Sequence, residues 1–342
     1  MTHSRALQGK SGDFLKINDR VYGLQEITDS AAIELINSKA LQRLKGISQE
    51  GTYSLTHGFD ITRLEHSIGV YLLLKKFNAS RKEQLAGLIH DVNHPVFSHV
   101  CDFVFGSQAE EDFQDRHFKE FINETELPGI LEKHGFKIKE LLDLHSFKLL
   151  ERQIPELCAD RIDYILRSFI MQKLASLEKI NAFLNALAVN RACFVFNDKA
   201  LAKEFALLFI KVNNEYYASP YGTAMFCLLA DAMKLGLKKG IISKADLFST
   251  DEFVYGKLAD SKDSEIINKL ELISKKTIVK EDDKAFDYCT VKKQRFVDPG
   301  ILLEGSVKRL SELDEGFNKA LNQLKKSGKE YKLRVLKVNN NG

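Results

Sequence analysis

The 342-residue chain contains little that would interrupt helices, and it has no apolar run long enough to cross a membrane. Only five prolines occur, and because proline breaks the interior of a helix, long helices are possible. A transmembrane helix needs roughly 20 consecutive apolar residues, and no such stretch is present. The first residues, MTHSRALQGKSGDF, also lack the apolar segment of a secretory signal. We therefore expect neither a membrane partner nor secretion.

Cysteine is scarce, and neither positive nor negative charge predominates. The five cysteines are widely spaced, odd in number and without a CxxC pair, so we expect no disulfide framework and no thiolate zinc site. This cysteine usage predicts a protein of the reducing cytoplasm. Lys and Arg number 50 against 47 Asp and Glu, giving a formal net charge of +3. A chain this close to neutral does not by itself imply a polyanionic partner.

The apolar periodicity predicts a mostly α protein. We expect a β-hairpin over 13–25, a helix that follows an N-cap at Ser30 and an irregular loop over 51–60. From 63 to 239 the pattern predicts successive helices, over Glu65–Phe77, Lys82–Asp91, Glu111–Glu124, Leu127–His134, Lys137–His145, Glu156–Phe169, Ile180–Ala188, Ala200–Asn213 and Tyr221–Lys238.

The pattern becomes mixed after about residue 246. Helical stretches are expected over Ser243–Leu258 and Ser261–Leu272, and strands are expected at 277–279, 288–291 and 333–338. A length of 342 residues suits one large domain with a smaller one. We therefore expect a first domain over 1–245 and a C-terminal α+β segment over 246–342.

The first half of the chain holds residue types that suit a metal site. His90 and Asp91 end an apolar helix, and adjacent residues can face one ion where the backbone turns at a helix end. His66 and Asp160 are distant in sequence, but helix packing could bring both beside that pair. Imidazole and carboxylate donors suit Zn, Fe, Mn, Ni and, less well, Mg. Such an ion would leave positions for water and a phosphate oxygen, lowering the pKa of the water and screening the phosphate charge.

A simpler explanation competes with this one. A single histidine on an apolar helix is more often a core or surface residue than a ligand, and one HisAsp dipeptide says little. Here, however, seven of nine histidines lie between His57 and His134, and three of them lie in the run from His90 to His99. That run follows a strongly apolar helix, where an unpaired charge would be costly. The clustering favours the metal site.

These motifs resemble those of the HD superfamily of metal-dependent phosphohydrolases, whose pattern is His…HisAsp…Asp. The similarity is greater to the branch of deoxynucleoside triphosphate triphosphohydrolases that includes the SAM-and-HD-domain enzyme. Motifs in that branch look like RFEHS, HDLGHGPFSH and DKWDY, where this chain has RLEHS at 63–67, HDVNHPVFSH at 90–99 and DRIDY at 160–164. The similarity covers about residues 20–235. It implies an HD-domain helical bundle between the hairpin and the α+β segment.

The resemblance also implies roles for individual residues. One divalent metal ion (Zn, Fe, Mn, Ni or Mg) would have four ligands, His66, His90, Asp91 and Asp160. The substrate contacts would come from Arg63 on a phosphate, Arg161 where the family has a phosphate-binding Lys, Tyr164 against the sugar, and the weaker matches Gln49 and Tyr217. A core tyrosine is the alternative for Tyr217.

Acid–base chemistry is implied for a second group. His94 and His99 would line the phosphate path. Asp102 would orient His117, which would donate a proton to the leaving oxygen; the alternative for His117 is an exposed helix residue.

The chain departs from the family pattern beside the predicted sugar site. Ser168 stands, by spacing, where the family has an Asp that reads the sugar 3′-hydroxyl, and Glu50 follows Gln49 where the family has Leu. Asn93 and Pro95 replace a glycine pair. These differences leave the predicted metal ligands intact and weaken the case for a deoxynucleotide substrate.

Three functions follow from the sequence. The leading hypothesis is hydrolysis of (deoxy)nucleoside triphosphates to nucleoside and triphosphate. The alternative within the superfamily is a nucleotidase or phosphodiesterase. An alternative of another class is a nucleotide- or nucleic-acid-binding regulator with vestigial activity, which the lysines at 275–280 and 325–332 would serve, although interspersed acids favour a solvated surface there. The segment after 246 could cap the active site, bind a partner or form a homo-oligomer contact.

Overall fold

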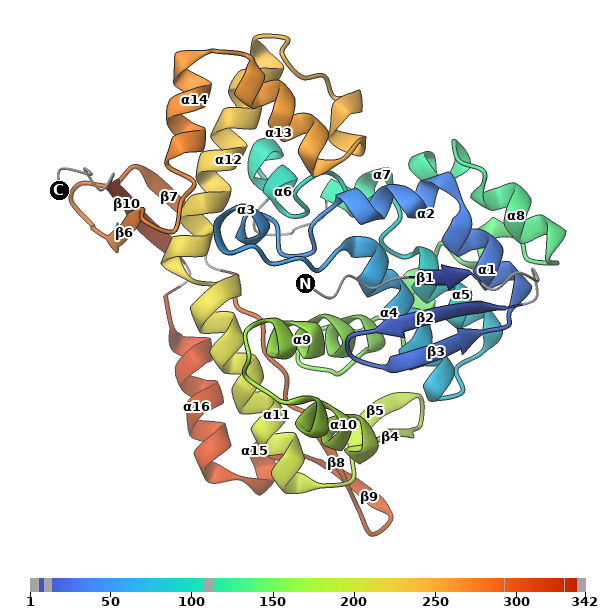
Figure 1. The fold of residues 1–342 in the computed structure, drawn as a ribbon. Helices are drawn as coiled ribbons and strands as arrows, with labels where there is room; N and C mark the ends of the chain where they lie inside the picture. The colour runs from blue at the N-terminus through green and yellow to red at the C-terminus, as the bar shows by residue number, and fades with distance from the viewer. Residues whose placement is uncertain (1–5, 9–13, 108–112, 292, 329, 337–342) are drawn as a thin grey trace.

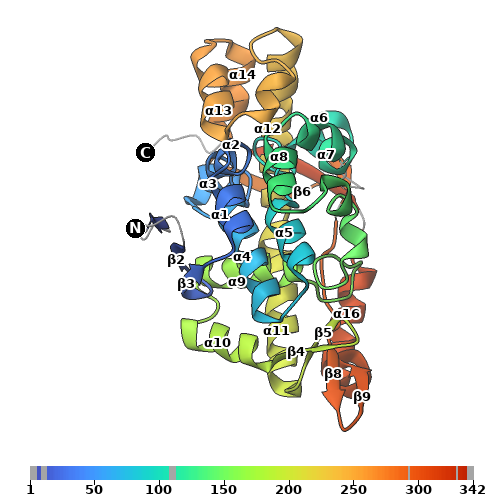
Figure 2. The ribbon, with the colours of Figure 1, turned by 90° about the vertical axis from the view of Figure 1, so that its right-hand side faces the viewer.

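A computed structural model describes residues 6–8, 14–107, 113–291, 293–328 and 330–336. The molecule is elongated, with α13 (Asp251–Asp260) and α14 (Ser264–Glu271) at one end and the hairpin of β8 (Gly300–Leu303) and β9 (Ser306–Arg309) at the other (Figures 1 and 2). Helices predominate between these ends, so the mostly α prediction is confirmed in outline. None of the helices within the described ranges combines the length and hydropathy needed to cross a bilayer.

The N-terminal residues form a small antiparallel sheet in the order β1-β2-β3. Its strands are β1 (Ala6–Gln8), β2 (Leu15–Asp19) and β3 (Gly23–Ile27). The predicted hairpin is therefore present as β2 and β3, while residue 13 lies outside the described part. Along β2 the buried residues alternate with exposed ones, which is the pattern of a strand with one face on the core.

The first helices differ in detail from the prediction. Asp29, rather than Ser30, caps α1 (Ser30–Asn37) by accepting from the amides of Ala31 and Ala32. Ser38 then interrupts the helix and caps α2 (Lys39–Arg43), because a short hydroxyl side chain competes for backbone amides. The prediction of a wholly irregular loop over 51–60 is wrong, since it contains the helix α3 (Tyr53–His57).

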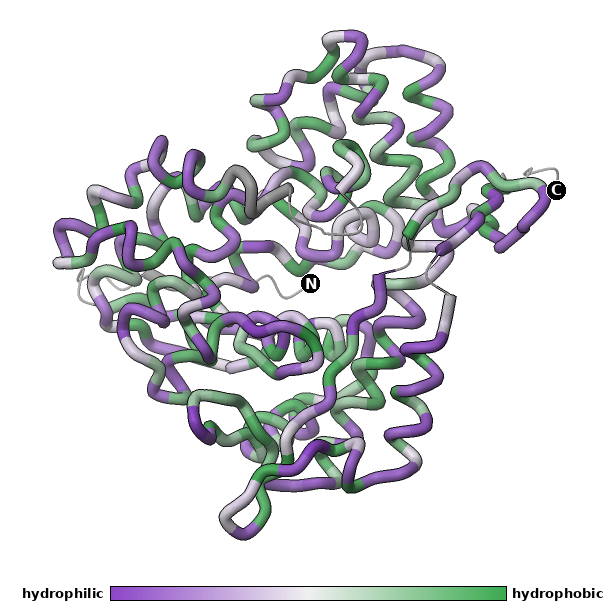
Figure 3. The backbone as a smooth tube through the Cα atoms, turned by 180° about the vertical axis from the view of Figure 1, so that it is seen from behind, coloured by the Kyte–Doolittle hydropathy of each residue, from purple (hydrophilic) through white to green (hydrophobic). Residues whose placement is uncertain are grey.

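The central helices lie close to their predicted ranges, except for α6 (Val100–Phe105), which was not predicted from the sequence. They are α4 (Arg63–Lys76), α5 (Arg81–Ile89), α6 (Val100–Phe105), α7 (Phe113–Asn123), α8 (Leu127–Lys133), α9 (Ala159–Met171), α10 (Leu177–Ala186), α11 (Lys199–Val212) and α12 (Pro220–Lys238). Residues 111–112 of one predicted helix lie outside the described part. Hydrophobic and hydrophilic residues alternate along many of the helices (Figure 3), as they do in helices with one face packed on a core.

One predicted helix, over Lys137–His145, is wrong. The segment forms two short 3-10 turns, η2 (Ile138–Glu140) and η3 (Leu144–Ser146). Neither turn has a capping hydrogen bond from a side chain, and a short helix without tertiary support or caps is marginal. Apolar side chains of this segment are nevertheless buried, as that of Leu141 is.

The second half of the chain contains two further sheets. The strands β4 (Leu187–Asn190) and β5 (Cys193–Phe196), unforeseen in the sequence, pair with β8 and β9 in the order β4-β5-β8-β9. The other sheet has the order β6-β10-β7 and consists of β6 (Ile278–Glu281), β7 (Tyr288–Val291) and β10 (Glu330–Leu336). These three strands match predicted ones, although 337–338 lie outside the described part.

The residues after 246 contribute to the main hydrophobic core. η5 (Ala245–Phe248), α15 (Leu310–Leu313) and α16 (Glu315–Lys326) complete the helices of this segment. Ile301, Leu310 and Phe317 belong to the same buried cluster as side chains of α4 and α9, and α16 lies beside α11 (Figure 1). The C-terminal segment therefore approaches the central helices closely enough to share a site with them.

Candidate metal centre

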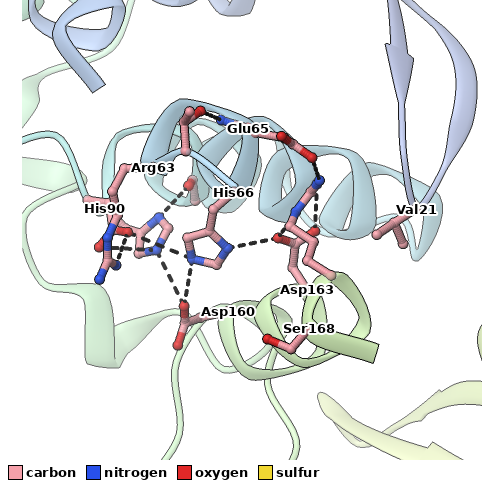
Figure 4. Close-up of polar contacts among 12 residues, drawn as sticks. Val21, Arg63, Glu65, His66, His90, Asp160, Asp163 and Ser168 are labelled. Atoms are coloured by element: carbon pink, nitrogen blue, oxygen red, sulfur yellow. Dashed lines mark hydrogen bonds and ion pairs between the residues drawn. The ribbon is translucent and has the colours of Figure 1, made fainter. Parts of the chain in front are cut away.

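Three helix ends meet at the predicted metal site. His66 lies in the first turns of α4, where Thr62 caps the helix by accepting from the amide of Glu65. His90 and Asp91 come directly after α5, and Asp160 lies in the first turn of α9. Figure 4 shows the imidazoles of His66 and His90 directed toward the carboxylate of Asp160.

The four side chains are close enough to share one ion. The Nε2 atom of His66 lies 2.9 Å from Asp160 Oδ1 and 3.8 Å from Asp91 Oδ2. The Nε2 atom of His90 lies 3.6 Å from a carboxylate oxygen of each aspartate. Ligands at ~2.1 Å from one cation are themselves about 3.0–3.4 Å apart, so these distances fit a coordination sphere with small adjustments.

Backbone and carboxylate partners fix which nitrogen each imidazole presents. The Nδ1 atom of His66 lies 2.7 Å from Asp163, and that of His90 lies 2.7 Å from the carbonyl of Gly87. Because both partners only accept hydrogen bonds, each Nδ1 carries the proton and each Nε2 faces the shared centre. This donor set of two imidazoles and two carboxylates suits a divalent transition metal.

The electrostatics of the cluster also favour a cation. Burial alone would lower the pKa of His66, but hydrogen bonds to Asp160 and Asp163 raise it to about 9. Burial would raise the pKa of Asp91, but Arg63 and the neighbouring imidazoles hold it well below its usual range. The carboxylates therefore stay ionised, and Asp160 holds on His66 Nε2 a proton that a metal ion would replace.

A buried ion network lies behind His66. Asp163 accepts hydrogen bonds from Arg167 at 2.7 Å and from the hydroxyl of Tyr22 at 2.9 Å. The guanidinium of Arg167, which is fully buried, also donates to Asp19 at 2.9 Å and to Glu65 at 2.6 Å. Since α4 crosses this network at Gly69, a Cβ there would collide with the side chains of Arg167 and Asp163. The network holds His66 in its orientation.

Two further contacts position the loop after α5. Arg43 donates to the carbonyls of Val92 and His94 at 2.7 and 2.9 Å. Asp251, from α13, accepts from the amides of Ser48 and Phe97 at 2.8 and 2.6 Å. The C-terminal segment thus helps to hold the loop that carries the HisAsp pair.

Arg63 connects the metal ligands to a cavity. Its Nη1 atom donates to Asp91 at 2.7 Å and its Nε atom donates to Ser98 at 2.9 Å. The cavity has about 820 Å³ of space, open solvent at its mouth included. Besides Arg63, its lining includes polar, aromatic and basic side chains from distant parts of the chain, among them Gln49, Glu50, Tyr53, His99, Tyr164, Tyr216, Tyr217, Lys293 and Arg295. Arg63 therefore has one end at the candidate metal ligands and also borders space for a substrate.

The predicted sugar-contacting residues line this cavity together. The rings of Tyr164 and Tyr217 lie 5.9 Å apart at a steep angle, and the hydroxyl of Tyr217 lies 2.5 Å from that of Ser168. Gln49 borders the same space, and within the described ranges its Oε1 atom has no hydrogen-bond partner although it is buried. An organic ligand with donor groups would satisfy it.

Arg161 has different surroundings from those predicted. Its guanidinium donates to the carbonyls of Glu156 and Arg152 at 2.6 and 3.1 Å and to the sulfur of Cys158 at 3.2 Å. It is not among the residues that line the cavity. In this arrangement Arg161 stabilises the loop before α9 instead of facing a phosphate.

The predicted acid–base residues His94, His99 and Asp102 follow the HisAsp pair along the chain. His99 lies 3.1 Å from Asp102, which also accepts from Ser107 at 3.0 Å. His94 is buried, and burial lowers its pKa well below the usual range, so its imidazole is neutral. Its ring lies 5.4 Å from that of His99. The backbone of His117 belongs to α7, but its side chain lies outside the described part, so the pair of Asp102 and His117 stays a prediction.

Several residues of the site were not foreseen. Asp163 and Arg167 had a signal in the sequence, because they follow Asp160 at spacings of three and seven and share its helix face. Arg43, Asp251 and Arg295 had none, since each reaches the site only through packing of a distant segment. Long-range contacts of this kind are not encoded in local spacing.

Comparison with known proteins identifies the family of the chain. The HD-domain family model matches residues 63–168, a range that begins at Arg63 and contains all four candidate ligands. The chain is 39% identical over 307 residues to the uncharacterized protein YdhJ of Bacillus subtilis, covering 89% of this chain and 94% of that one. It is 28% identical to the metal-dependent phosphohydrolase cns2 of Cordyceps militaris, over 84% of this chain and 85% of that one.

Two other similarities are narrower in what they show. The chain is 31% identical over 155 residues to the deoxynucleoside triphosphate triphosphohydrolase SAMHD1 of Gallus gallus, a match covering 38% of this chain and 25% of that protein. A crystal structure of a hypothetical protein from Aquifex aeolicus superposes with a TM-score of 0.69 at 20% identity, over 94% of this chain and 95% of that one. At that identity the likeness shows the fold alone.

The match to the HD-domain family model and the relatives that cover most of the chain show its family. The chain is a member of the HD superfamily of metal-dependent phosphohydrolases.

Proposed function

We propose that this protein hydrolyses a phosphoester bond of a nucleotide with one divalent metal ion held by His66, His90, Asp91 and Asp160. The observation that carries the proposal is that each of the two imidazoles lies 2.9–3.8 Å from both aspartates, beside Arg63 and a ring-lined cavity. The metal, when bound, supplies Lewis-acid activation of water and screening of phosphate charge.

The residues around the centre have separate tasks in this proposal. Arg63 exchanges part of its contact with Asp91 for a phosphate oxygen, because its fork of donors suits both partners. Asp163 holds the Nε2 atom of His66 toward the ion. A histidine partnered by Asp102 protonates the leaving oxygen; His99 lies at hydrogen-bond distance from Asp102, and His117 is the residue predicted from the sequence. Variants of each histidine distinguish the two.

A nucleoside triphosphate is the first candidate substrate, and nucleoside and triphosphate are its expected products. The resemblance of three motifs to the triphosphohydrolase branch and the partial similarity to SAMHD1 support it. Lys293 and Arg295 support it too, because they add positive charge to the cavity beside Arg63.

A nucleotidase acting on monophosphates is the second candidate, and Arg161 favours it. With its guanidinium on backbone carbonyls, the cavity has one cation fewer for a polyphosphate than the family pattern implies. A monophosphate needs less positive charge than a triphosphate.

The test is a screen of nucleoside mono-, di- and triphosphates with added Mn²⁺, Mg²⁺, Zn²⁺ or Ni²⁺, with phosphate, pyrophosphate and triphosphate resolved. Triphosphate release identifies the first candidate, and phosphate release from monophosphates alone identifies the second. The control is Asp91→Ala, which we expect to abolish turnover while the fold is retained. Equal activity of the control and the natural protein would contradict the site.

A further inference from the structure

Glu50 is a buried carboxylate in the wall of the cavity that the metal centre borders. It is 6% exposed, and it lines the same space as Arg63, Tyr164 and Tyr217. A buried carboxylate is costly unless hydrogen-bond donors satisfy it. Its position in a substrate cavity therefore requires an explanation beyond packing.

The loop around Glu50 is fixed from both sides. Before it, the amide of Ser48 donates to Asp251 at 2.8 Å. After it, Gly51 adopts a positive φ of 53°, and a Cβ there would lie 2.8 Å from the ring of Phe226. These constraints hold the carboxylate in place before any ligand arrives, which is the condition for selective recognition.

A chain of hydroxyl groups ends at this carboxylate. The hydroxyl of Ser168 donates to Glu50 Oε1 at 2.9 Å, and the hydroxyl of Tyr217 lies 2.5 Å from that of Ser168. Because Ser168 has one hydroxyl proton and gives it to Glu50, Tyr217 donates to Ser168. Among the described residues none donates to Glu50 Oε2. The carboxylate thus retains capacity to accept from a ligand.

Ser168, the partner of Glu50, lies on the same helix as the candidate ligand Asp160. Ser168 follows Asp160 by eight residues on α9, which places it about 12 Å further along the helix axis. Tyr164 lies between them and also lines the cavity. A nucleotide with its phosphate at Arg63 therefore extends along α9 toward Glu50, with its sugar beyond the ring of Tyr164.

We infer that Glu50 accepts hydrogen bonds from the sugar hydroxyl groups of the substrate, and that the substrate class is a ribonucleotide. The inference rests on the proposed function. A carboxylate only accepts hydrogen bonds, and the 2′- and 3′-hydroxyls of ribose are vicinal donors that its two oxygens can bind together. A sugar without these hydroxyls leaves the buried carboxylate of Glu50 without its hydrogen-bond donors. A polar site discriminates against a ligand that lacks the matching groups for this reason.

The test compares kcat and KM for ATP, 2′-deoxyATP and 2′,3′-dideoxyATP, or for the monophosphates if only these are hydrolysed. The proteins are the natural chain, Glu50→Gln, Glu50→Leu and the exposed control Glu252→Gln. We expect the natural chain and the control to prefer the ribonucleotide over the dideoxynucleotide by about ten- to hundred-fold in kcat/KM, the usual effect of a charged hydrogen bond. In Glu50→Leu this ratio falls to within about threefold, mainly through KM for the ribonucleotide.

The outcomes separate the inference from the function it rests on. If the natural chain hydrolyses nucleotides without regard to sugar hydroxyls, or if Glu50→Leu keeps the preference, the role of Glu50 is wrong and the proposed function stands. The protein could also prefer ATP over ITP, in a way that depends on Glu50, and show no preference among sugars. That result would overturn the inferred sugar contact and show that Glu50 recognises the base. Absence of turnover with every nucleotide removes both. The side chain of Glu50→Gln has nearly the same shape as glutamate. Thermal melting followed by circular dichroism shows whether this variant is folded.

Discussion

Asp163 and His66 meet across two helices, with a carboxylate oxygen of Asp163 2.7 Å from the Nδ1 atom of His66. Both side chains are completely buried. The contact fixes the tautomer that presents Nε2 to the candidate metal centre, and Arg167 in turn holds Asp163 at 2.7 Å. The geometry of the site therefore depends on residues that need not touch substrate or ion.

Asp163→Asn tests this dependence. We expect metal affinity to fall about 10- to 100-fold, the usual effect of losing a carboxylate behind a ligating histidine. Calorimetric titration with Mn²⁺ measures it, and the control is Asp260→Asn, an exposed aspartate on α13. Activity of Asp163→Asn should recover as the Mn²⁺ concentration rises. Unchanged affinity would show that Asp163 serves stability only.

Gly69→Ala tests the close approach of α4 and α9. A Cβ at Gly69 would collide with Asp163 and Arg167, whereas a Cβ at Gly256 meets nothing within 4 Å. Inserting a methyl group into a packed core typically costs about 1–3 kcal/mol, while Gly256→Ala should be neutral or stabilise by up to ~1 kcal/mol. Urea denaturation measures both. Equal stability of the two variants would contradict the packing of the network.

Arg63→Ala and Arg161→Ala separate a substrate contact from a structural one. Arg63→Ala should lower kcat/KM by about 10²- to 10³-fold, as removal of a transition-state donor does. Arg161→Ala should change kcat/KM less than tenfold and should lower the melting temperature, because its guanidinium binds backbone carbonyls. The opposite pattern would return Arg161 to the phosphate-binding role that the sequence predicts.

Asp251 gives the fold a pH dependence of known sign. Burial raises its pKa from 3.8 to about 7, although the amides of Ser48 and Phe97 oppose the shift. Between these values the folded state binds more protons than the unfolded state, so the contribution of Asp251 to stability is lost as pH rises from about 4 to 7. The free energy of unfolding of Asp251→Asn, relative to the natural chain, should therefore rise over that interval, by at most about 4 kcal/mol. A constant difference across this interval would contradict the shift.

The metal-site motifs could be found in the sequence because their signals are local. His90 and Asp91 are adjacent at a helix end, and His66 and Asp160 lie in the first turns of helices that the sequence predicted. That these helices meet followed from the resemblance, since periodicity does not specify which helices pack together.

The features that the sequence did not predict depend on contacts between segments that are distant along the chain. Arg161 was expected to face a phosphate, but the carbonyls of the preceding loop bind it. Arg295 comes from a segment whose local pattern says little, and it reaches the cavity only because the C-terminal strands and helices pack against the centre. The strands β4 and β5 were missed for the same reason, since pairing with β8 extends their sheet.

The most direct measurement is anomalous diffraction from crystals grown with Mn²⁺. The account predicts one anomalous peak within about 2.0–2.3 Å of the Nε2 atoms of His66 and His90 and of carboxylate oxygens of Asp91 and Asp160. A peak held instead by Glu151 and Cys158, which with Asp160 form the other candidate group of ligands in the described residues, would contradict the account. So would an ordered site without any peak at saturating Mn²⁺.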